Sequence, residues 1–335
     1  MNNRGKMNYI LGIDQGASNT RAAVMDSDGN ILGYGKTHGT YFPRDGMSNS
    51  LEIISNAVDN ARINANVKIK NIRMIVVGIT GIDYEGDDVF VRDEFKKFFG
   101  VDEVHAFNDC VIAYYGGTTD EVGAVLCAGT GINAAFFTPD NKIWVMSDYL
   151  KASLQGGSAI ARRAAEALFE SEIGLWPDTK LKQIFLELAD ADTVDEVLKK
   201  YILDYDFSIK MTKYIPKQII KIAGEGDEVA QMVLKSFSDE LCTCFLAAMK
   251  KKNMLDLNCK IVLAGSVYKG SDSYLRTVTI KTLRETAHNA EIVNAVFEPV
   301  VGACVLGVHK ATGKFDNDML GRAIDSANKF GLDRV

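Results

Sequence analysis

The sequence lacks the features that would tie it to a membrane, to nucleic acid or to an oxidising compartment. No apolar run approaches the roughly 20 residues of a membrane-spanning helix, and the polar start Met1–Asn8 holds no apolar signal region. The net charge is −6 and no dense basic run occurs, which argues against a nucleic-acid surface. The 6 cysteines form no C-x-x-C pair and lie mostly in apolar runs, which is typical of buried thiols. We therefore expect a cytoplasmic protein with no membrane and no nucleic-acid partner.

Several common cofactor motifs are also absent. No G-x-x-x-x-G-K-[ST] occurs, which excludes the phosphate loop of P-loop enzymes. No G-x-G-x-x-G follows the first apolar run, so a Rossmann dinucleotide site is not expected. The 4 histidines show neither H-x-x-x-H nor H-E-x-x-H spacing, which disfavours a zinc enzyme.

What the sequence does contain is one pattern that occurs twice. Residues 10–34 and 124–145 each read as an apolar run, a turn of Gly, Ser or Thr, a second apolar run, a turn with Asp and Asn or Gly, and a third apolar start. This pattern predicts three strands joined by tight turns. The two copies indicate a duplicated architecture, which suits the 335-residue length. A phosphate chain held between two Gly-rich hairpin turns is the obvious use of such a pair.

The rest of the chain alternates between strand and helix patterns. In the first half, we expect strands over 9–13, 21–25, 31–36, 72–78 and 103–108, and helices over 47–64, 87–99 and from 110. In the helix 87–99, Phe90, Phe95 and Phe98 are expected to point inward. In the second half, we expect a long helix from 159, an all-helical stretch, strands over 260–263 and 291–296, and helices over 273–287, 299–312 and 315–330.

These patterns predict domain boundaries. We expect an N-terminal α/β domain over 1–117 and a C-terminal α/β domain over 118–312, with a helical insertion at about 171–257. A C-terminal helix over 313–335 closes the chain.

Asp14 is the first candidate for chemistry, because it ends a predicted strand just before a turn of small polar residues. Glycine lets backbone N–H groups approach a phosphate, and Ser18, Asn19 and Thr20 add side-chain donors. A carboxylate here would repel phosphate directly, so its plausible task is to hold a hydrated Mg²⁺. The alternative is an ordinary hairpin turn with a turn-favouring Asp. The turn Gly-Thr-Gly at 129–131 takes the equivalent place in the second copy.

Asp109 and the segment 264–267 are the other candidates. Asp109 follows a strand and precedes a helix, so it is either a helix N-cap or a general base at a strand end. Phosphoryl transfer from ATP to a hydroxyl needs positioning, a metal and one carboxylate near the attacking oxygen. The segment 264–267 (Ala-Gly-Ser-Val) again ends a strand before a helix, where a glycine lets a nucleoside lie against the backbone. A plain β–α turn is the alternative for that segment.

Five segments in order resemble one fold. They are D-Q-G-A-S-N-T at 14–20, N-D at 108–109, A-G-T-G at 128–131, A-G-S-V at 264–267 and P-V-V-G-A at 299–303. The set resembles the fold of actin, hexokinase and the heat-shock-chaperone ATPases. Within that fold it looks most like the N-acetylglucosamine kinase-like group of the BadF/BadG/BcrA/BcrD ATPase family, over about residues 8–312.

The resemblance implies an α/β fold of two duplicated ribonuclease H-like α/β domains around a nucleotide cleft, and an ATP-dependent sugar kinase. Its cofactors would be ATP and Mg²⁺, and its small-molecule substrate a sugar or amino sugar. Apart from the resemblance, we expect a homodimer, because this is the commonest assembly of soluble enzymes. Asp14 would bind hydrated Mg²⁺, and Asp109 would be the general base that accepts the proton of the sugar hydroxyl. The phosphates would be held by Gly16, Ser18, Asn19, Thr20, Gly129, Thr130 and Gly131. The nucleoside would be bordered by Gly265 and Ser266, and the acceptor by Asn108, Asp109, Thr130 and Gln155.

Three departures from the family concern the sugar half of the site. The usual G-D-E-G-S stretch is Leu154–Ser158 here, without either acidic residue, and the upstream W-G element is replaced near 148–151. The loop at 39–46, which normally offers an Asn to the sugar, has none. Arg44 or Lys151 would suit an anionic acceptor, although each is more often a solvated surface charge.

Two other functions stay open from the sequence. One is an ATPase activator of a CoA-ester reductase or dehydratase, whose subunits share an iron–sulfur cluster. Cys127 resembles a ligand of that group, yet no further cysteine occurs before Cys242. The other is a sugar- or nucleotide-binding regulator without turnover, against which the presence of Asp109 argues.

Overall fold

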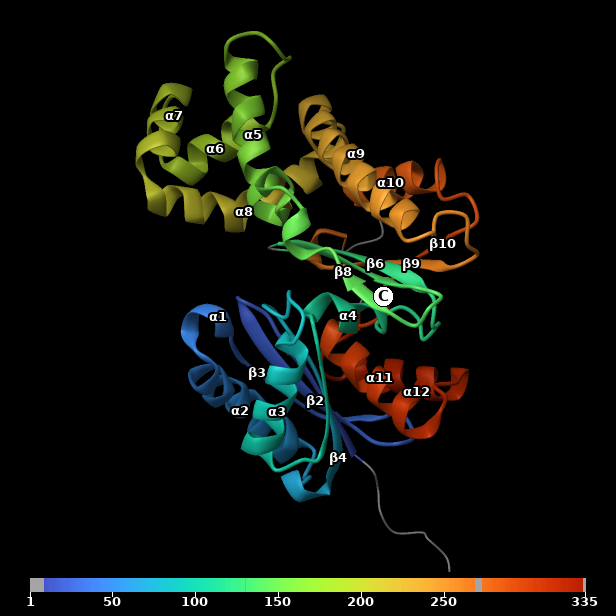
Figure 1. Ribbon diagram of the computed structural model, residues 1–335. Coiled ribbons are helices and arrows are strands. Elements are labelled where there is room, and N and C mark those ends of the chain that lie inside the picture. Colours follow the sequence, from blue (N-terminus) through green and yellow to red (C-terminus); the bar gives the residue numbers. More distant parts are fainter. Residues whose placement is uncertain (1–8, 130, 269–272, 334–335) are drawn as a thin grey trace, which may run out of the picture. The chain divides into compact units, whose positions relative to one another are not determined.

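The computed structural model describes residues 9–129, 131–268 and 273–333 (Figure 1). Its first sheet has five strands: β1 (Tyr9–Gln15), β2 (Asn19–Met25), β3 (Ile31–His38), β4 (Ile72–Ile79) and β5 (Glu103–Phe107). The spatial order is β3-β2-β1-β4-β5. Strand β1 pairs antiparallel with β2 and parallel with β4, which in turn pairs parallel with β5. The tight turn after β1 explains the hairpin, while the crossovers to β4 and β5 contain helices.

The second sheet repeats this topology. Its strands are β6 (Gly123–Ala128), β7 (Ile132–Phe137), β8 (Ile143–Val145), β9 (Lys260–Ala264) and β10 (Glu291–Asn294), in the order β10-β9-β6-β7-β8. Read from the other edge, this is again third, second, first, fourth and fifth strand. The predicted duplication is therefore confirmed.

The helices of the first half follow its strands. They are α1 (Phe42–Asp45), α2 (Met47–Asn64), α3 (Asp87–Phe99) and α4 (Asp109–Tyr114), with a 3-10 turn at Ile69–Asn71. The third and fourth strands of the first sheet are thus joined by little more than the single long helix α2.

In the second half, the same crossover carries many more helices. They are α5 (Gly156–Glu172), α6 (Leu181–Ala189), α7 (Val194–Leu203), α8 (Tyr205–Gly224) and α9 (Glu228–Lys251), after 3-10 turns at Ser147–Tyr149 and Ala152–Leu154. Local capping starts several of them, because Asp204 and Asp227 cap α8 and α9 and Thr193 forms a capping box with Glu196. After β9 come a 3-10 turn at Ser266–Tyr268, α10 (Tyr274–Arg284), α11 (Pro299–Thr312) and α12 (Asn317–Asn328).

Contacts divide the chain into two compact units. Of the described residues, unit 1 comprises 9–125, 135–145 and 293–333, and unit 2 comprises 126–129, 131–134, 146–268 and 273–292. The domain boundaries that we expected at 117 and 312 stay a prediction. In the described ranges 9–129, 131–268 and 273–333, no helix is long and apolar enough to cross a membrane.

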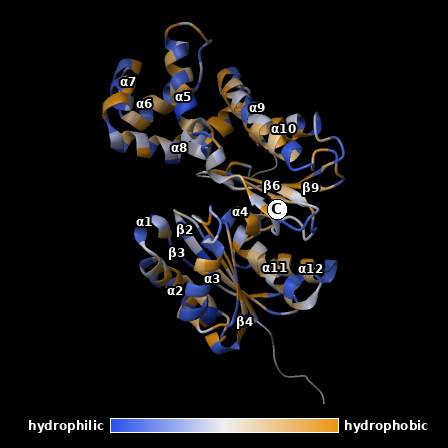
Figure 2. Cartoon of the chain, viewed as in Figure 1, coloured by the Kyte–Doolittle hydropathy of each residue, from blue (hydrophilic) through white to orange (hydrophobic). Residues whose placement is uncertain are grey.

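The first sheet of unit 1 is covered on both faces. One face packs on α2 and α3 through side chains such as Leu11, Ile13 and Val77, and the other packs on α11 and α12 through Ile10 and Val76. Alternation along a strand sends neighbouring side chains to opposite faces, so these strands are apolar throughout. Figure 2 shows this hydrophobic colouring along the strands.

Helix α2 lies directly on strand β3. A Cβ atom added to Gly33 would stand 2.2 Å from the carbonyl oxygen of Ala61, and one added to Gly35 would stand 2.1 Å from that of Ala57. Only glycine allows so close an approach of helix and strand backbones.

One expectation about α3 is wrong. Phe95 is fully buried, but Phe90 and Phe98 are 48% and 46% exposed. Val91 and Phe95, four residues apart, form the inward face, and the other two rings lie on its flanks. There Phe90 meets Phe42, and Phe98 meets Phe99.

Candidate functional site

The carboxyl edge of the first sheet gathers three aspartates of unit 1. Strands β1, β4 and β5 are parallel, with Asp14 opposite Gly78 and Gly78 opposite Phe107. Asp14 therefore lies at the end of β1, and Asp109 follows β5 at the same edge. Asp83 lies in the loop after β4. Ligands of open α/β sheets bind at this edge, so the arrangement identifies it as a candidate site.

Asp14 is buried and paired with a residue that we had not predicted. The Nη1 atom of Arg21 donates to its Oδ2 atom at 3.0 Å. Burial lowers the pKa of Arg21, but the charges of Asp14 and Glu298 outweigh it and raise that pKa overall. Arg21 therefore stays a cation and balances the charge of Asp14.

Asp109 is half-buried at the first position of α4. Burial and, after it, the negative charges of Asp14 and Asp83 raise the pKa of Asp109 from 3.8 to about 7. A carboxyl group whose pKa lies near neutral pH can both accept and release a proton, as a general base must.

Asn108 fixes the backbone beside Asp109. It caps α4, because its Oδ1 atom accepts from the backbone N–H of Cys110 at 3.1 Å. Its Nδ2 atom donates to the carbonyl oxygen of Ile82 at 3.0 Å and to Oδ1 of Asp83 at 3.1 Å. The N-cap role that we left open for Asp109 thus falls to Asn108.

The β1–β2 turn has the form expected of a phosphate-binding turn. The backbone N–H of Gly16 donates to the carbonyl oxygen of Asn19 at 2.9 Å, which closes the turn. Ser18 is exposed and Asn19 half-exposed, so both can reach a ligand. Thr20 is buried, which leaves its hydroxyl inside the sheet.

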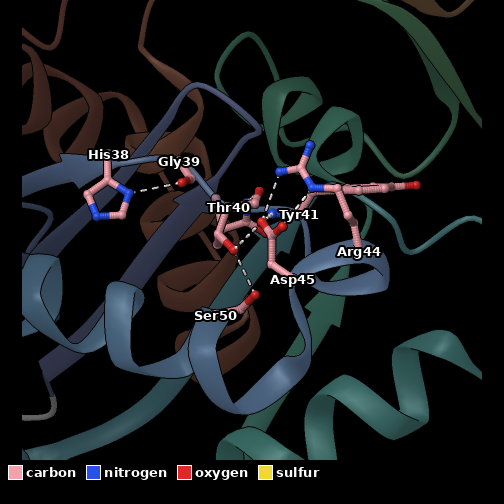
Figure 3. Close-up of polar contacts among 8 residues, drawn as sticks. His38, Gly39, Thr40, Tyr41, Arg44, Asp45 and Ser50 are labelled. Carbon is pink, nitrogen blue, oxygen red and sulfur yellow. Dashed lines mark hydrogen bonds and ion pairs between the residues drawn. The ribbon is translucent and has the colours of Figure 1, made fainter.

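The loop at 39–46 contains no Asn, and hydrogen bonds to the Asp45 carboxylate fix its conformation (Figure 3). Asp45 accepts from the Thr40 hydroxyl at 3.1 Å and from the backbone N–H of Tyr41 at 2.8 Å. Arg44 donates to the same carboxylate at 2.6 and 3.0 Å, and the Thr40 hydroxyl also bonds that of Ser50 at 2.8 Å. These bonds, with that from Arg44 first, hold the pKa of Asp45 far below its usual range.

The two cations that we considered for an anionic acceptor both have acidic neighbours. Arg44 pairs with Asp45, and the Lys151 ammonium lies 3.5 Å from Oε1 of Glu240. Arg163 bonds the other oxygen of Glu240 at 2.5 Å. Each cation therefore forms a local ion pair, and a role of either in binding an anionic acceptor stays a prediction.

In unit 2, the second Gly-rich turn lies beside the start of α5. The backbone N–H of Gly129 donates to the carbonyl oxygen of Gly131 at 2.9 Å, and that of Gly157 donates to Gly129 at 3.0 Å. A Cβ atom added to Gly131 would stand 3.9 Å from Oε1 of Gln155. The structure thus brings Gly129, Gly131 and Gln155 together, while Thr130 lies outside the described residues.

The turn after β9 lies against the same segment. Gly265 has a φ of +100°, and a Cβ atom on it would stand 2.1 Å from the carbonyl oxygen of Ala128. The Ser266 hydroxyl would be 3.8 Å from a Cβ atom on Gly129. The conformation and the close approach both require glycine at 265.

No group of three or more His, Cys, Asp or Glu side chains that could hold a metal occurs within 9–129, 131–268 and 273–333. Mg²⁺ needs no such group, because it commonly binds through one or two carboxylates together with substrate phosphates and water. Asp14 at the end of β1 fits that kind of binding.

Comparison with known proteins shows what the chain is similar to. The model of the BadF/BadG/BcrA/BcrD ATPase family matches residues 11–307. The N-acetyl-D-glucosamine kinase of Dictyostelium discoideum is 23% identical over 320 residues, covering 90% of this chain and 98% of the relative. The glucosamine kinase of Vibrio cholerae is 24% identical over 275 residues, covering 80% of this chain and 88% of the relative.

A solved structure shows the same fold. A proposed N-acetylglucosamine kinase from Chromobacterium violaceum matches with a TM-score of 0.66 at 16% identity, covering 90% of this chain and 99% of that one. The predicted α/β fold and the predicted sugar kinase-like class of enzyme are confirmed by these matches. The chain belongs to the BadF/BadG/BcrA/BcrD ATPase family.

Proposed function

We propose that this protein is an ATP-dependent kinase that phosphorylates a hydroxyl of a sugar or amino sugar. The observation that carries the proposal is Asp109, half-buried at the carboxyl edge of the sheet with its pKa raised to about 7. A binding protein has no need of a base at that position. The relatives named as N-acetylglucosamine and glucosamine kinases support the substrate class.

Asp109 is the general base of the proposed reaction. Its carboxylate takes the proton of the acceptor hydroxyl, and the hydroxyl oxygen forms a bond to the γ-phosphorus of ATP. The bond from that phosphorus to the oxygen it shares with the β-phosphate breaks, and ADP leaves.

The remaining site residues bind and orient. We assign the phosphates to Gly16, Ser18, Asn19, Gly129, Thr130 and Gly131. Thr20, which the sequence suggested for the same task, has a buried hydroxyl and is assigned to the support of the turn. We assign the nucleoside to Gly265 and Ser266, and the acceptor to Asn108, Thr130 and Gln155. Asp14 would hold Mg²⁺ through water, and when bound this ion neutralises phosphate charge.

The test is ATP consumption with Mg²⁺ against a panel of amino sugars, hexoses, sugar acids and sugar alcohols. We expect turnover that depends on one class of acceptor, and Asp109→Asn should lower it roughly 10²–10⁴-fold. Asp88→Asn, a change of an exposed carboxylate at the start of α3, is the matched control and should leave turnover unchanged. Near-normal turnover of Asp109→Asn would remove Asp109 from this role.

ATP consumption that does not depend on an acceptor would instead favour the activator of a CoA-ester enzyme. That function needs an iron–sulfur cluster, and the sequence has no cysteine between Cys127 and Cys242 to serve as a second ligand. Iron analysis of the purified protein separates the two functions.

We also propose that the protein is a cytoplasmic homodimer, the commonest assembly of soluble enzymes. Light scattering after size-exclusion chromatography tests the assembly.

A further inference from the structure

The β1–β2 turn lies directly on the loop that follows β3. The backbone N–H of Gly39 donates to the carbonyl oxygen of Ser18 at 3.1 Å. The backbone N–H of Thr40 donates to the carbonyl oxygen of Gly16 at 3.3 Å. A Cβ atom added to Gly39 would stand 2.4 Å from the carbonyl oxygen of Ala17. Protein occupies this side of the turn, so a ligand can bind only on the opposite side.

The side chain of Gln15 adds a bridge between the turn and the loop. Gln15 is fully buried at the end of β1. Its Nε2 atom donates to the carbonyl oxygen of Gly16 at 3.0 Å and to that of Thr40 at 2.5 Å. Its Oε1 atom accepts no hydrogen bond from the residues that the structure describes. The protein thus uses this amide as a donor to two backbone carbonyl groups.

These bonds fix the direction of the peptide group between Gly16 and Ala17. The peptide bonds of the described residues are all trans, and the C=O and N–H of a trans peptide point in opposite directions. Because the Gly16 carbonyl is held towards Gln15 and Thr40, the Ala17 N–H points away from them. Gln15 and Asp14 are neighbours on β1, so their side chains leave opposite faces of the sheet. The Ala17 N–H therefore points to the side on which Asp14 lies, and Ala17 itself is exposed.

We propose that Gln15 is a positioning residue, which holds the peptide between Gly16 and Ala17 so that the Ala17 N–H donates a hydrogen bond to a phosphate oxygen of ATP. This inference rests on the proposed kinase function. Gln15 itself does not touch the nucleotide. Without its amide, this peptide is free to turn over, because glycine permits most backbone conformations. The turn then presents the carbonyl oxygen of Gly16 to the phosphate, which repels it.

The test compares the binding of ATP with Mg²⁺ and the binding of adenosine, each by calorimetric titration. Gln15→Met keeps the length of the side chain and removes its N–H groups. The preference for ATP, taken as the ratio of Kd for adenosine to Kd for ATP, should fall about 10–100-fold in this variant, as expected for one hydrogen bond to a charged group. The Kd for adenosine should stay unchanged, because adenosine has no phosphate.

This ratio separates positioning from a purely structural role. Gln231→Met is the matched control, because Nε2 of Gln231 also donates to a backbone carbonyl oxygen, that of Ala223 at 2.8 Å. It should leave the preference for ATP unchanged. If Gln15 only stabilises the fold, Gln15→Met lowers the urea midpoint and likewise leaves this preference unchanged. That result would overturn the inference.

Amide hydrogen exchange of the wild-type protein, followed residue by residue by NMR, gives a second readout that needs no variant. The Ala17 N–H should exchange more slowly with saturating ATP and Mg²⁺ than with adenosine. Equal exchange rates would contradict the inference even if Gln15→Met fails to fold. A protein that binds ATP but phosphorylates no sugar would refute the kinase, and both measurements would still test Gln15. A protein that does not bind ATP would overturn both proposals.

Discussion

Asp109→Asn should make the protein more stable at neutral pH while it removes turnover. The pKa of this carboxyl rises from 3.8 to about 7 on folding, so the folded state binds its proton more tightly than the unfolded state does. For such a group, stability is greatest below the unfolded pKa and is lost as the pH rises towards the folded one. The wild-type protein therefore loses stability between about pH 4 and pH 7 through Asp109.

The size of this loss of stability follows from how far folding raises the pKa of Asp109. About three pKa units correspond to at most about 4 kcal/mol, and solvent around a half-buried group reduces this to about 1–2 kcal/mol. Asparagine cannot ionise, so Asp109→Asn does not lose this stability as the pH rises. We expect its melting temperature to exceed that of the wild type by a few degrees at pH 8, and by less at pH 5.

The assay is a pair of thermal melts at pH 5 and pH 8, without nucleotide or metal. Asp88→Asn serves as the control, because it removes an exposed carboxylate in the first turn of α3 and should lower the melting temperature by the same small amount at both pH values. An Asp109→Asn protein whose advantage is the same at both pH values, or is absent at pH 8, would refute the reasoning. In turnover, the same group should make kcat/KM of the wild type fall about tenfold per pH unit below about pH 7.

Two further changes test the packing around the site. Gly265→Ala places a Cβ atom 2.1 Å from the carbonyl oxygen of Ala128 and should cost about 3 kcal/mol in urea unfolding. Gly226→Ala, also at positive φ but with nothing within 4 Å, should cost only about 1 kcal/mol, and equal losses would contradict the role of the contact. Arg21→Met leaves the buried carboxylate of Asp14 without its cation and should cost about 3 kcal/mol at pH 7; an unchanged urea midpoint would show that the pair contributes nothing.

Regular periodicity made much of the fold predictable. The helices at 47–64, 87–99 and 299–312 have the bounds that the sequence indicated. Apolar spacing marks all three, glycine or proline flanks both ends of the last two, and Gly46 precedes the first. Phe90 and Phe98 were misplaced because an aromatic residue on the flank of a helix is partly covered by a neighbouring ring. Hydrophobicity alone does not separate that position from the core.

The site was predictable only where its residues lie in local motifs. Asp14 and Asp109 end predicted strands, which a sequence shows directly. Arg21 left a signal that we did not use, since hairpin register alone places it opposite Asp14. No local sequence pattern indicated Asp83, because its contact with Asn108 joins two segments that are 25 residues apart in the chain. Such a contact depends on the parallel order of the strands, which no local pattern encodes.

The close contact between α2 and β3 limits where the first half of this chain can accept an insertion. With Gly33 and Gly35 against the helix backbone, the first half has no space for an added layer between β3 and α2. The matching strand of the second half, β8 (Ile143–Val145), contains no glycine, and four extra helices follow α5 before β9. A new module should therefore be inserted after β8, in the crossover that already contains the additional helices.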